Sequence, residues 1–347
     1  MKSLILKYNW LCLALVCCAI FVACEPAEVA TKEKAIAFKN GQVRAIAEEE
    51  ANARLFAYRI AEGAEMEWLY GDADEGAYAQ LTDVNLERSK AKFVIDDNGT
   101  KYWTDATYNF FTIYSPSKFD KEPTFNTETK TFTFPYAIDD VTSSDNEIWA
   151  AARLNESHLA SETNPIQFEF NHILSKINFR IKKHSSNNDN KIIVTKVSIS
   201  NVYTSGVYNL DVVKKSEKWV RNLDENGEVV DECPPLEFTP GASNSQIQPA
   251  GTLVLGGDGF LTIPQTVGVN TMKIVIAYDY YDEIEGITPT YSKEVEAYLP
   301  VSVVKEWEVG KNYIYNLLLS AETNDIFFTT PTISDWGTSP VGSIIIQ

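Results

Sequence analysis

The chain has 347 residues and a formal net charge of −18, with 30 lysines and arginines against 48 aspartates and glutamates. This acidity argues against nucleic-acid binding, which needs cations to neutralise phosphates, and against docking of the folded part on anionic lipid. With 44% hydrophobic and 22% charged residues, the composition is that of an ordinary globular protein, which excludes disordered and coiled-coil classes. The length suggests about two domains.

The first residues have the layout of a secretory signal peptide. Lys2 and Lys7 give a basic start, and residues 11–23 form an uncharged, mostly apolar run that is too short to span a bilayer comfortably. A buried core helix is the alternative interpretation of this run. The small residue directly before Cys24 indicates a lipoprotein cleavage site. We therefore expect residues 1–23 to be removed and acyl chains on Cys24 to anchor the mature protein in a membrane.

The five cysteines fit this interpretation. Three of them, Cys12, Cys17 and Cys18, lie in the segment to be removed, and Cys24 is the expected lipid carrier. Cys233 then remains alone, so the mature chain has no cysteine pair for an internal disulfide. No histidine or basic cluster lies near Cys233 in the sequence, and we interpret it as a small buried hydrophobic residue.

The remaining chain has a hydrophobic period of two rather than 3.6, which is typical of strands buried on one face. Residues 45–61 have the composition of an amphipathic helix, but residues 55–60 also fit a strand, which we favour. We expect a short helix within residues 143–154. Alternation of apolar and polar residues predicts further strands at residues 132–136, 176–182, 272–280 and 313–319. Many short strands separated by turn residues predict an all-β fold of antiparallel β-sandwiches.

Two features of the loops bear on the organisation of the chain. Polar residues at 155–165 separate two halves of similar character, so we expect an N-terminal domain over residues 24–165 and a C-terminal domain over residues 166–347. The segment Gly256-Gly257-Asp258-Gly259 is glycine-rich, but no lysine or helix signal follows it to hold a phosphate. We interpret it as a hairpin turn.

Motifs for catalysis are lacking, which indicates a protein that is not an enzyme and needs no cofactor. None of the three histidines, His158, His172 and His184, stands at a metal-ligand spacing, and no nucleophile elbow or nucleotide-binding glycine pattern is present. His172 lies between apolar positions of a strand, which favours a hydrogen-bonded structural role. Two acidic clusters, around Asp72 and around Asp279, have residue types that suit calcium, but we interpret them as solvated loops.

Several segments, taken together and in order, resemble the Bacteroidales fimbrillins, a family of lipoprotein pilins and their accessory subunits. The matching blocks are Ile36-Ala37-Phe38-Lys39-Asn40-Gly41-Gln42-Val43-Arg44-Ala45, Lys101-Tyr102-Trp103 with Phe110 to Pro116, Phe168 to Ile177, Trp307 to Tyr315, and Asp335-Trp336 before a short apolar tail. The resemblance covers residues 24 to 347 and implies two transthyretin-like β-sandwich domains in tandem.

The same resemblance implies a mechanism of assembly. A lipidated precursor reaches the outer membrane, where a protease cuts after an arginine and removes the first strand. By match to the family block, this cut falls between Arg44 and Ala45, with Arg54 and Arg59 as alternative positions. The C-terminal strand of another subunit then fills the apolar groove by β-strand addition.

The donor strand implied by the resemblance is the apolar tail, with Val341, Ile344, Ile345 and Ile346 as its side chains. The alternative is an ordinary last strand that packs on its own domain. The function expected from the sequence is therefore that of a fimbrial subunit for cell adhesion. Its expected partners are other fimbrillin subunits, the outer membrane, a processing protease and surface ligands.

A monomeric surface lipoprotein that binds glycan is the alternative function. Aromatic residues make up 12% of the chain, which is enough for a sugar-stacking platform if some of them are exposed. Such a protein would keep its first strand and present exposed tryptophan or tyrosine side chains to its ligand.

Overall fold

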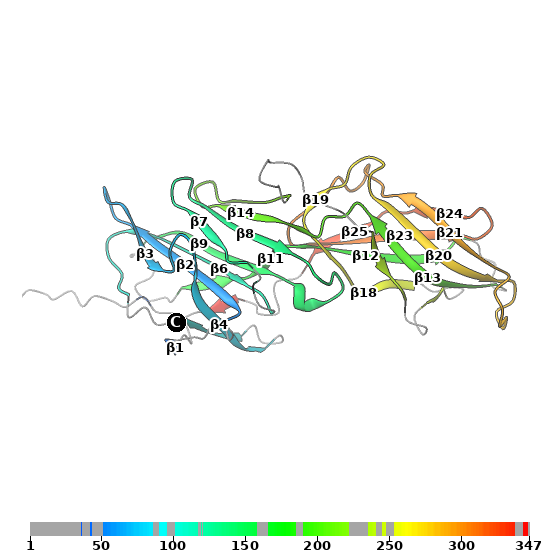
Figure 1. Ribbon diagram of the computed structural model, residues 1–347, viewed down its shortest axis with the longest axis horizontal. Coiled ribbons are helices and arrows are strands. Elements are labelled where there is room, and N and C mark those ends of the chain that lie inside the picture. Colours follow the sequence, from blue (N-terminus) through cyan, green and yellow to red (C-terminus); the bar gives the residue numbers. More distant parts are fainter. Residues whose placement is uncertain are drawn as a thin grey trace, which may run out of the picture. The chain divides into compact units, whose positions relative to one another are not determined.

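The structure is a computed structural model. It describes residues 36, 42–43, 51–85, 90–95, 101–116, 119, 121–157, 166–184, 190–221, 235–240, 245–247, 253–336 and 343–345. All of these residues belong to one compact unit, residues 35–347. Across these ranges the regular structure is β-strand apart from the 3-10 turn Ser144–Asn146, which confirms the all-β fold class (Figure 1). No helix in the described part is long and apolar enough to cross a membrane.

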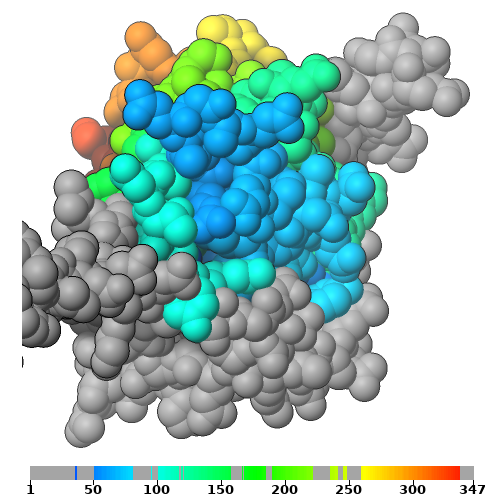
Figure 2. All heavy atoms as spheres, turned by 90° about the vertical axis from the view of Figure 1, so that its left-hand side faces the viewer, coloured from blue at the N-terminus to red at the C-terminus, as the bar shows by residue number. Residues whose placement is uncertain are grey.

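Two sheets pack together in the first half of the chain. The eight-stranded sheet has the order β1 (Gln42–Val43), β5 (Lys90–Ile95), β4 (Ala77–Asn85), β2 (Ala53–Ile60), β6 (Thr107–Tyr114), β9 (Trp149–Ser157) and β11 (Asn171–His172), with β3 (Met66–Tyr70) also paired to β2. A four-stranded sheet has the order β15 (Ser216–Val220), β14 (Ser205–Asp211), β8 (Thr131–Ala137) and β7 (Thr124–Asn126). Figure 2 shows one face of this part, where residues of the first strands (blue) form much of the surface.

The eight-stranded sheet is buried on both faces. In β2, Leu55 belongs to one hydrophobic cluster and Phe56 to another, and in β6 the neighbours Phe110 and Phe111 divide in the same way. Successive side chains of a strand point to opposite faces, so these two clusters lie on opposite sides of the sheet. We name them the inner core, which includes Leu55 and Phe110, and the outer core, which includes Phe56 and Phe111. The four-stranded sheet covers the outer core with Phe132, Phe134, Tyr208 and Leu210.

A second pair of sheets encloses the core of the C-terminal half. One sheet has the order β18 (Leu253–Thr262), β12 (Ser175–Lys183), β23 (Lys311–Ser320) and β24 (Asp325–Phe328), with β25 (Thr332–Asp335) also on β23. The other has the order β16 (Leu236–Phe238), β13 (Lys191–Ser200), β20 (Lys273–Tyr281) and β21 (Tyr291–Tyr298), with β17 (Gln246–Ile247) also on β13. The alternation predicted at 176–182, 272–280 and 313–319 is confirmed, since Ile177, Ile276 and Tyr315 face this shared core.

Trp307 lies at the centre of this second core. The short strand β22 (Glu306–Trp307) pairs with β19 (Gln265–Thr266), and the Trp307 side chain is fully buried. Its indole N–H donates to the hydroxyl of Tyr315, 3.0 Å away, so the buried polar atom has a partner. Trp307 therefore serves the packing of this core.

Three local predictions are settled by the strands. The strand favoured at residues 55–60 is confirmed as β2, whereas only Ser144–Asn146 of the helix expected within residues 143–154 is helical, and β9 follows it. The hairpin turn expected at 256–259 is wrong. Those four residues lie inside β18, between Leu255 and Phe260, which pair with Phe179 and Ile177 of the same strand β12. The glycines therefore form an excursion within one strand, opposite Asn178.

Two strands from the second half of the chain complete a sheet of the first half. The hairpin of β14 and β15 follows β13 in sequence, yet β14 pairs with β8 along its whole length, from Ser205 opposite Ala137 to Asp211 opposite Thr131. Half of the four-stranded sheet thus comes from beyond residue 165. The division into domains at that position stays a prediction, but hydrogen bonding between strands crosses it.

Gly259 allows a test of the excursion in β18. Its φ is +106°, and a Cβ atom would lie 2.6 Å from Nδ2 of Asn178, whose side chain is held by a hydrogen bond to Asn312. Gly259→Ala should lower the free energy of unfolding by about 2–3 kcal/mol, from backbone strain and overlap together. Gly63 has a φ of +71° with nothing within 4 Å, so Gly63→Ala should cost only about 1 kcal/mol. Urea denaturation of both variants measures the difference, and equal losses would contradict the steric account.

Candidate functional site

The inner core is covered by short segments from distant parts of the chain. Phe168 and Phe170 are both fully buried in it, and β10 (Gln167–Glu169) contains the first of them. Ile36 is 6% exposed and belongs to the same cluster. The backbone N–H of Ile36 donates to the carbonyl oxygen of Lys101 at 2.7 Å. A residue close to the start of the expected mature chain therefore helps to close the hydrophobic core of the first half.

The N-terminal segment also extends the eight-stranded sheet. Strand β1 pairs in parallel with β5, with Gln42 opposite Val94 and Val43 opposite Ile95. It is the outermost strand on this side of the sheet. Ile36 and β1 thus supply a buried side chain and an edge strand, and their loss would uncover β5 and part of the inner core.

The C-terminal strand reaches the same region. Strand β26 (Ser343–Ile345) pairs antiparallel with β10, with Ile344 opposite Phe168 and Ser343 opposite Glu169. It also lies beside β5, as the short red strand in Figure 1 indicates. Segments from both ends of the chain therefore meet around β5 and β10, next to the inner core. This shared location is our candidate functional site.

Most of the site residues predicted from sequence lie outside the described residues. These are Cys24, Arg44, Ala45, Val341 and Ile346, together with the signal segment 1–23. Their roles stay predictions. Ile344 and Ile345 are described in their backbone pairing, on the chain's own β10.

Arg54 and Arg59, the alternative cleavage positions, are both held in β2. Arg54 is 2% exposed and forms two hydrogen bonds of 2.6 Å with the carboxylate of Glu122. Arg59 pairs with Glu67 on the neighbouring strand β3, through bonds of 2.8 and 2.9 Å. A protease needs an accessible, locally unfolded segment, and a central strand with paired arginines does not offer one. The site at Arg44 is therefore the better candidate.

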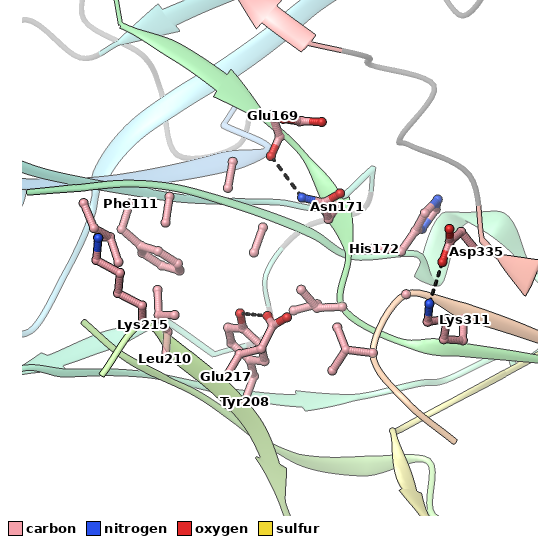
Figure 3. A pocket seen from close by; sticks show the side chains of 17 residues that line it. Phe111, Glu169, Asn171, His172, Tyr208, Leu210, Lys215, Glu217, Lys311 and Asp335 are labelled. Atoms are coloured by element: carbon pink, nitrogen blue, oxygen red, sulfur yellow. Dashed lines mark hydrogen bonds and ion pairs between the residues drawn. The ribbon is translucent and has the colours of Figure 1, made fainter. Parts of the chain in front are cut away.

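A hollow of about 600 Å³ opens on the outer-core side of the same sheet (Figure 3). Phe111, Tyr208 and Leu210 form its apolar floor. Two of the acids around it have partners: Glu217 accepts a 2.6 Å hydrogen bond from the Tyr208 hydroxyl, and Asp335 accepts one from Lys311. These paired carboxylates have structural roles and do not form a set of free acid and base groups.

His172 stands at the edge of this hollow. Its Nε2 accepts a hydrogen bond from the Trp149 indole at 3.2 Å, and its ring stacks on Trp336 with 4.0 Å between centroids and 7° between planes. Nδ1 has no partner among the described residues. Burial, followed by the nearby Lys176 ammonium, lowers the pKa of His172 to about 3. The structural role predicted for this histidine is confirmed, but no pattern in the sequence indicated that Trp336 is its partner.

The two acidic clusters considered for calcium shape loops. The Asp72 carboxylate accepts hydrogen bonds from the backbone N–H groups of Asp74 and Glu75, at 2.8 and 2.9 Å. In the other cluster, the Asp279 carboxylate accepts from Ser292 and that of Asp282 from Thr290. No group of three potential metal ligands occurs within the described ranges. These contacts give the acids a structural explanation.

The chain is similar to known proteins in sequence and in fold. The model of the fimbrillin-like family matches residues 48–336. A fimbrial protein from Bacteroides vulgatus is similar in fold, with a TM-score of 0.59 and 16% identity over 87% of this chain and 100% of that one. A putative cell adhesion protein from Bacteroides uniformis gives 0.47, with 16% identity over 87% and 98%. The tip fimbrial protein Mfa3 from Porphyromonas gingivalis gives 0.39, with 10% identity over 85% and 97%. Among curated proteins, none matches.

The low pKa of His172 makes stability depend on pH. The unfolded histidine takes up a proton near its ordinary pKa of about 6.5, whereas the folded one does so only near 3. Between these values the unfolded state binds more protons, so stability falls as the pH falls. His172→Phe removes this group, and at pH 4 the stability of the wild type relative to the variant should be about 2–3 kcal/mol lower than at pH 7. Chemical denaturation at both pH values measures this difference, with His184→Gln as control, and an unchanged difference would contradict it.

Proposed function

Because this chain belongs to the fimbrillin-like family, we propose that it is a surface-exported fimbrial subunit that assembles with other subunits by strand exchange and serves cell adhesion. One observation carries this proposal. Segments from both ends of the chain meet beside the core of the first half: Ile36 is buried in that core, β1 pairs with β5, and β26 pairs with β10.

The physical basis is the cost of uncovering an apolar surface. If residues up to Arg44 are removed, the sheet loses its edge strand β1, and Ile36 leaves the inner core. The free edge of β5 then presents unpaired backbone groups beside exposed apolar side chains, and both favour the addition of a new strand. A strand from another subunit can supply the same backbone bonds, with alternate side chains entering the core.

The C-terminal strand is the proposed donor, and before exchange it would stay paired with β10 of its own chain. An antiparallel pair of three residues, Ser343–Ile345 on Gln167–Glu169, is short. An isolated pair of this size is marginal in water, so a modest gain elsewhere is enough to move the strand to a neighbouring subunit. In this proposal the same strand pairs with its own chain in the monomer and with a neighbouring subunit in the fibre.

Export and anchoring complete the proposal. We infer that residues 1–23 direct secretion and that Cys24 carries the lipid that holds the precursor in the outer membrane. Cleavage between Arg44 and Ala45 by a surface protease would then separate the lipid from the folded subunit and start the exchange.

The alternative, a monomeric glycan-binding lipoprotein, has less support. The most exposed aromatic side chains among the described residues are Tyr102, Tyr298 and Phe327, at 40%, 48% and 41%. Tyr102 lies in the first half of the chain, whereas Tyr298 and Phe327 lie on β21 and β24 of the second. All the described tryptophans are buried or half-buried. A stacking platform needs neighbouring exposed rings, and these three do not supply one.

Limited proteolysis tests the trigger. An arginine-specific protease at low dose should release the N-terminal segment from the purified precursor and yield a ladder of multimers on non-denaturing gels. Arg44→Ala should prevent both events, whereas Lys39→Ala removes another basic residue of the same segment and should leave them unchanged. Release of the segment with no multimers would favour the monomeric alternative.

Deletion of residues 338–347 tests the donor. The shortened subunit should remain folded, since the described cores keep their side chains, but it should be unable to extend another subunit. Mixed with cleaved wild type, it should still accept a strand and thereby end growing multimers. Multimers formed from the shortened subunit alone would show that the donor is assigned to the wrong segment.

A further inference from the structure

Strand β25 precedes the proposed donor strand, and it is weakly embedded. All four of its residues, Thr332–Asp335, are exposed. It is held to β23 by backbone pairing and, at its end, by an ion pair of 2.6 Å between Lys311 and Asp335. Exposed ion pairs of this kind contribute little to stability. The side chains of β25 therefore give it no buried anchor.

Trp336 follows β25 directly and supplies the anchor that the strand lacks. Its ring stacks on His172, and the Lys176 ammonium lies 5.0 Å from the centre of the same ring. Its backbone N–H donates to the carbonyl of Gly310 at 2.8 Å. It also packs against a small apolar cluster that includes Leu174. One side chain thus makes an aromatic stack, a cation–π contact and an apolar contact.

The groups that hold Trp336 are themselves fixed. His172 is 4% exposed, and its Nε2 accepts a hydrogen bond from the indole N–H of Trp149 on β9. Lys176 lies 3.8 Å from the Glu147 carboxylate, with both side chains mostly buried. The stack therefore joins the end of β25 to β11 and to the start of β12, which are far from it in sequence.

We propose that Trp336 holds the chain in place just before the C-terminal strand, so that β26 stays paired with β10 of its own chain until exchange. We call this side chain with its contacts to His172 and Lys176 the latch. This inference rests on the proposed strand exchange and names the residue that restrains it. With Trp336 in place, six residues separate the anchor from Ser343. Without it, the last firmly embedded strand is β24, which ends at Phe328, so the connecting length roughly doubles and closure on β10 becomes less favourable.

Hydrogen exchange on the uncleaved full chain tests the latch without relying on assembly. Trp336→Ala should speed exchange of the β25 amides about tenfold, from loss of the stack and the cation–π contact. The β26 amides should exchange about threefold faster, from the longer connection. The amides of β20, which lies in the other sheet of this half, should not change. Trp336→Phe keeps an aromatic ring for the stack and should restore most of the protection.

A matched control lies on the neighbouring strand. Phe327 of β24 is 41% exposed and contacts the His184 ring at 5.0 Å, on the same sheet. Phe327→Ala removes an equivalent aromatic–histidine contact and should leave β25 and β26 unchanged. The latch is overturned if Trp336→Ala changes exchange of β25 by less than twofold, or if Phe327→Ala changes it equally.

Assembly gives the second readout. After cleavage, Trp336→Ala should form multimers several-fold faster than the wild type, with Phe327→Ala at the wild-type rate. An unchanged or slower rate would overturn the restraining role. If the cleaved wild type forms no multimers at all, the proposed strand exchange fails, while the exchange rates of β25 and β26 in the uncleaved chain still decide whether Trp336 holds them.

Discussion

A sheet that is apolar on both faces must be covered on both, and the rest of this structure depends on that constraint. In β2 and β6, neighbouring residues such as Phe110 and Phe111 face opposite cores, so neither side of the sheet can be left to water. The outer face receives a four-stranded sheet. The inner face receives short segments, including Ile36 and Phe168, which belong to parts of the chain far apart in sequence.

This difference between the two covers explains where exchange can occur. The outer cover is one four-stranded sheet, made of the hairpins β7–β8 and β14–β15 paired along β8 and β14, and removing it would expose Phe132, Phe134 and Tyr208 together. The inner cover is made of pieces, each held by a few backbone bonds and one or two side chains. Pieces of this size open at a lower cost than whole sheets do. In the proposed strand exchange, the outer cover therefore stays in place and a piece of the inner cover is replaced on the same sheet.

The sequence predicted those strands whose period and burial agree. Ile177, Phe179 and Ile181 alternate with polar or exposed residues, and a period of two finds such a strand directly. A period of two could not show that β6 is buried on both of its faces, because a continuous apolar run fits a buried strand and a buried helix equally well. The short helix expected within residues 143–154 is limited to the 3-10 turn Ser144–Asn146 for a related reason: Ala150 and Ala151 favour helix in isolation, but each fills a core on one face of β9.

Pairings between distant residues were beyond the sequence as well. Nothing in the local pattern places Trp336 on His172, or β14 on β8, since both depend on how the strands are ordered in the sheets. The glycine-rich segment 256–259 was wrongly predicted to be a hairpin turn, because glycine is common both in turns and at irregular points within strands. The candidate site could be predicted only at the residues that match a family block. That segments from both ends of the chain meet there could not be predicted, because it depends on the order of the strands.

The late return of β14 and β15 also governs how this protein can be made. The outer core of the first half includes Tyr208 and Leu210, so it is incomplete until synthesis has passed residue 211. A nascent chain that stops short of that point presents Phe111 and Phe134 to solvent, which invites aggregation. Strands from both sides of residue 165 must therefore be present before the outer core of the first half can close.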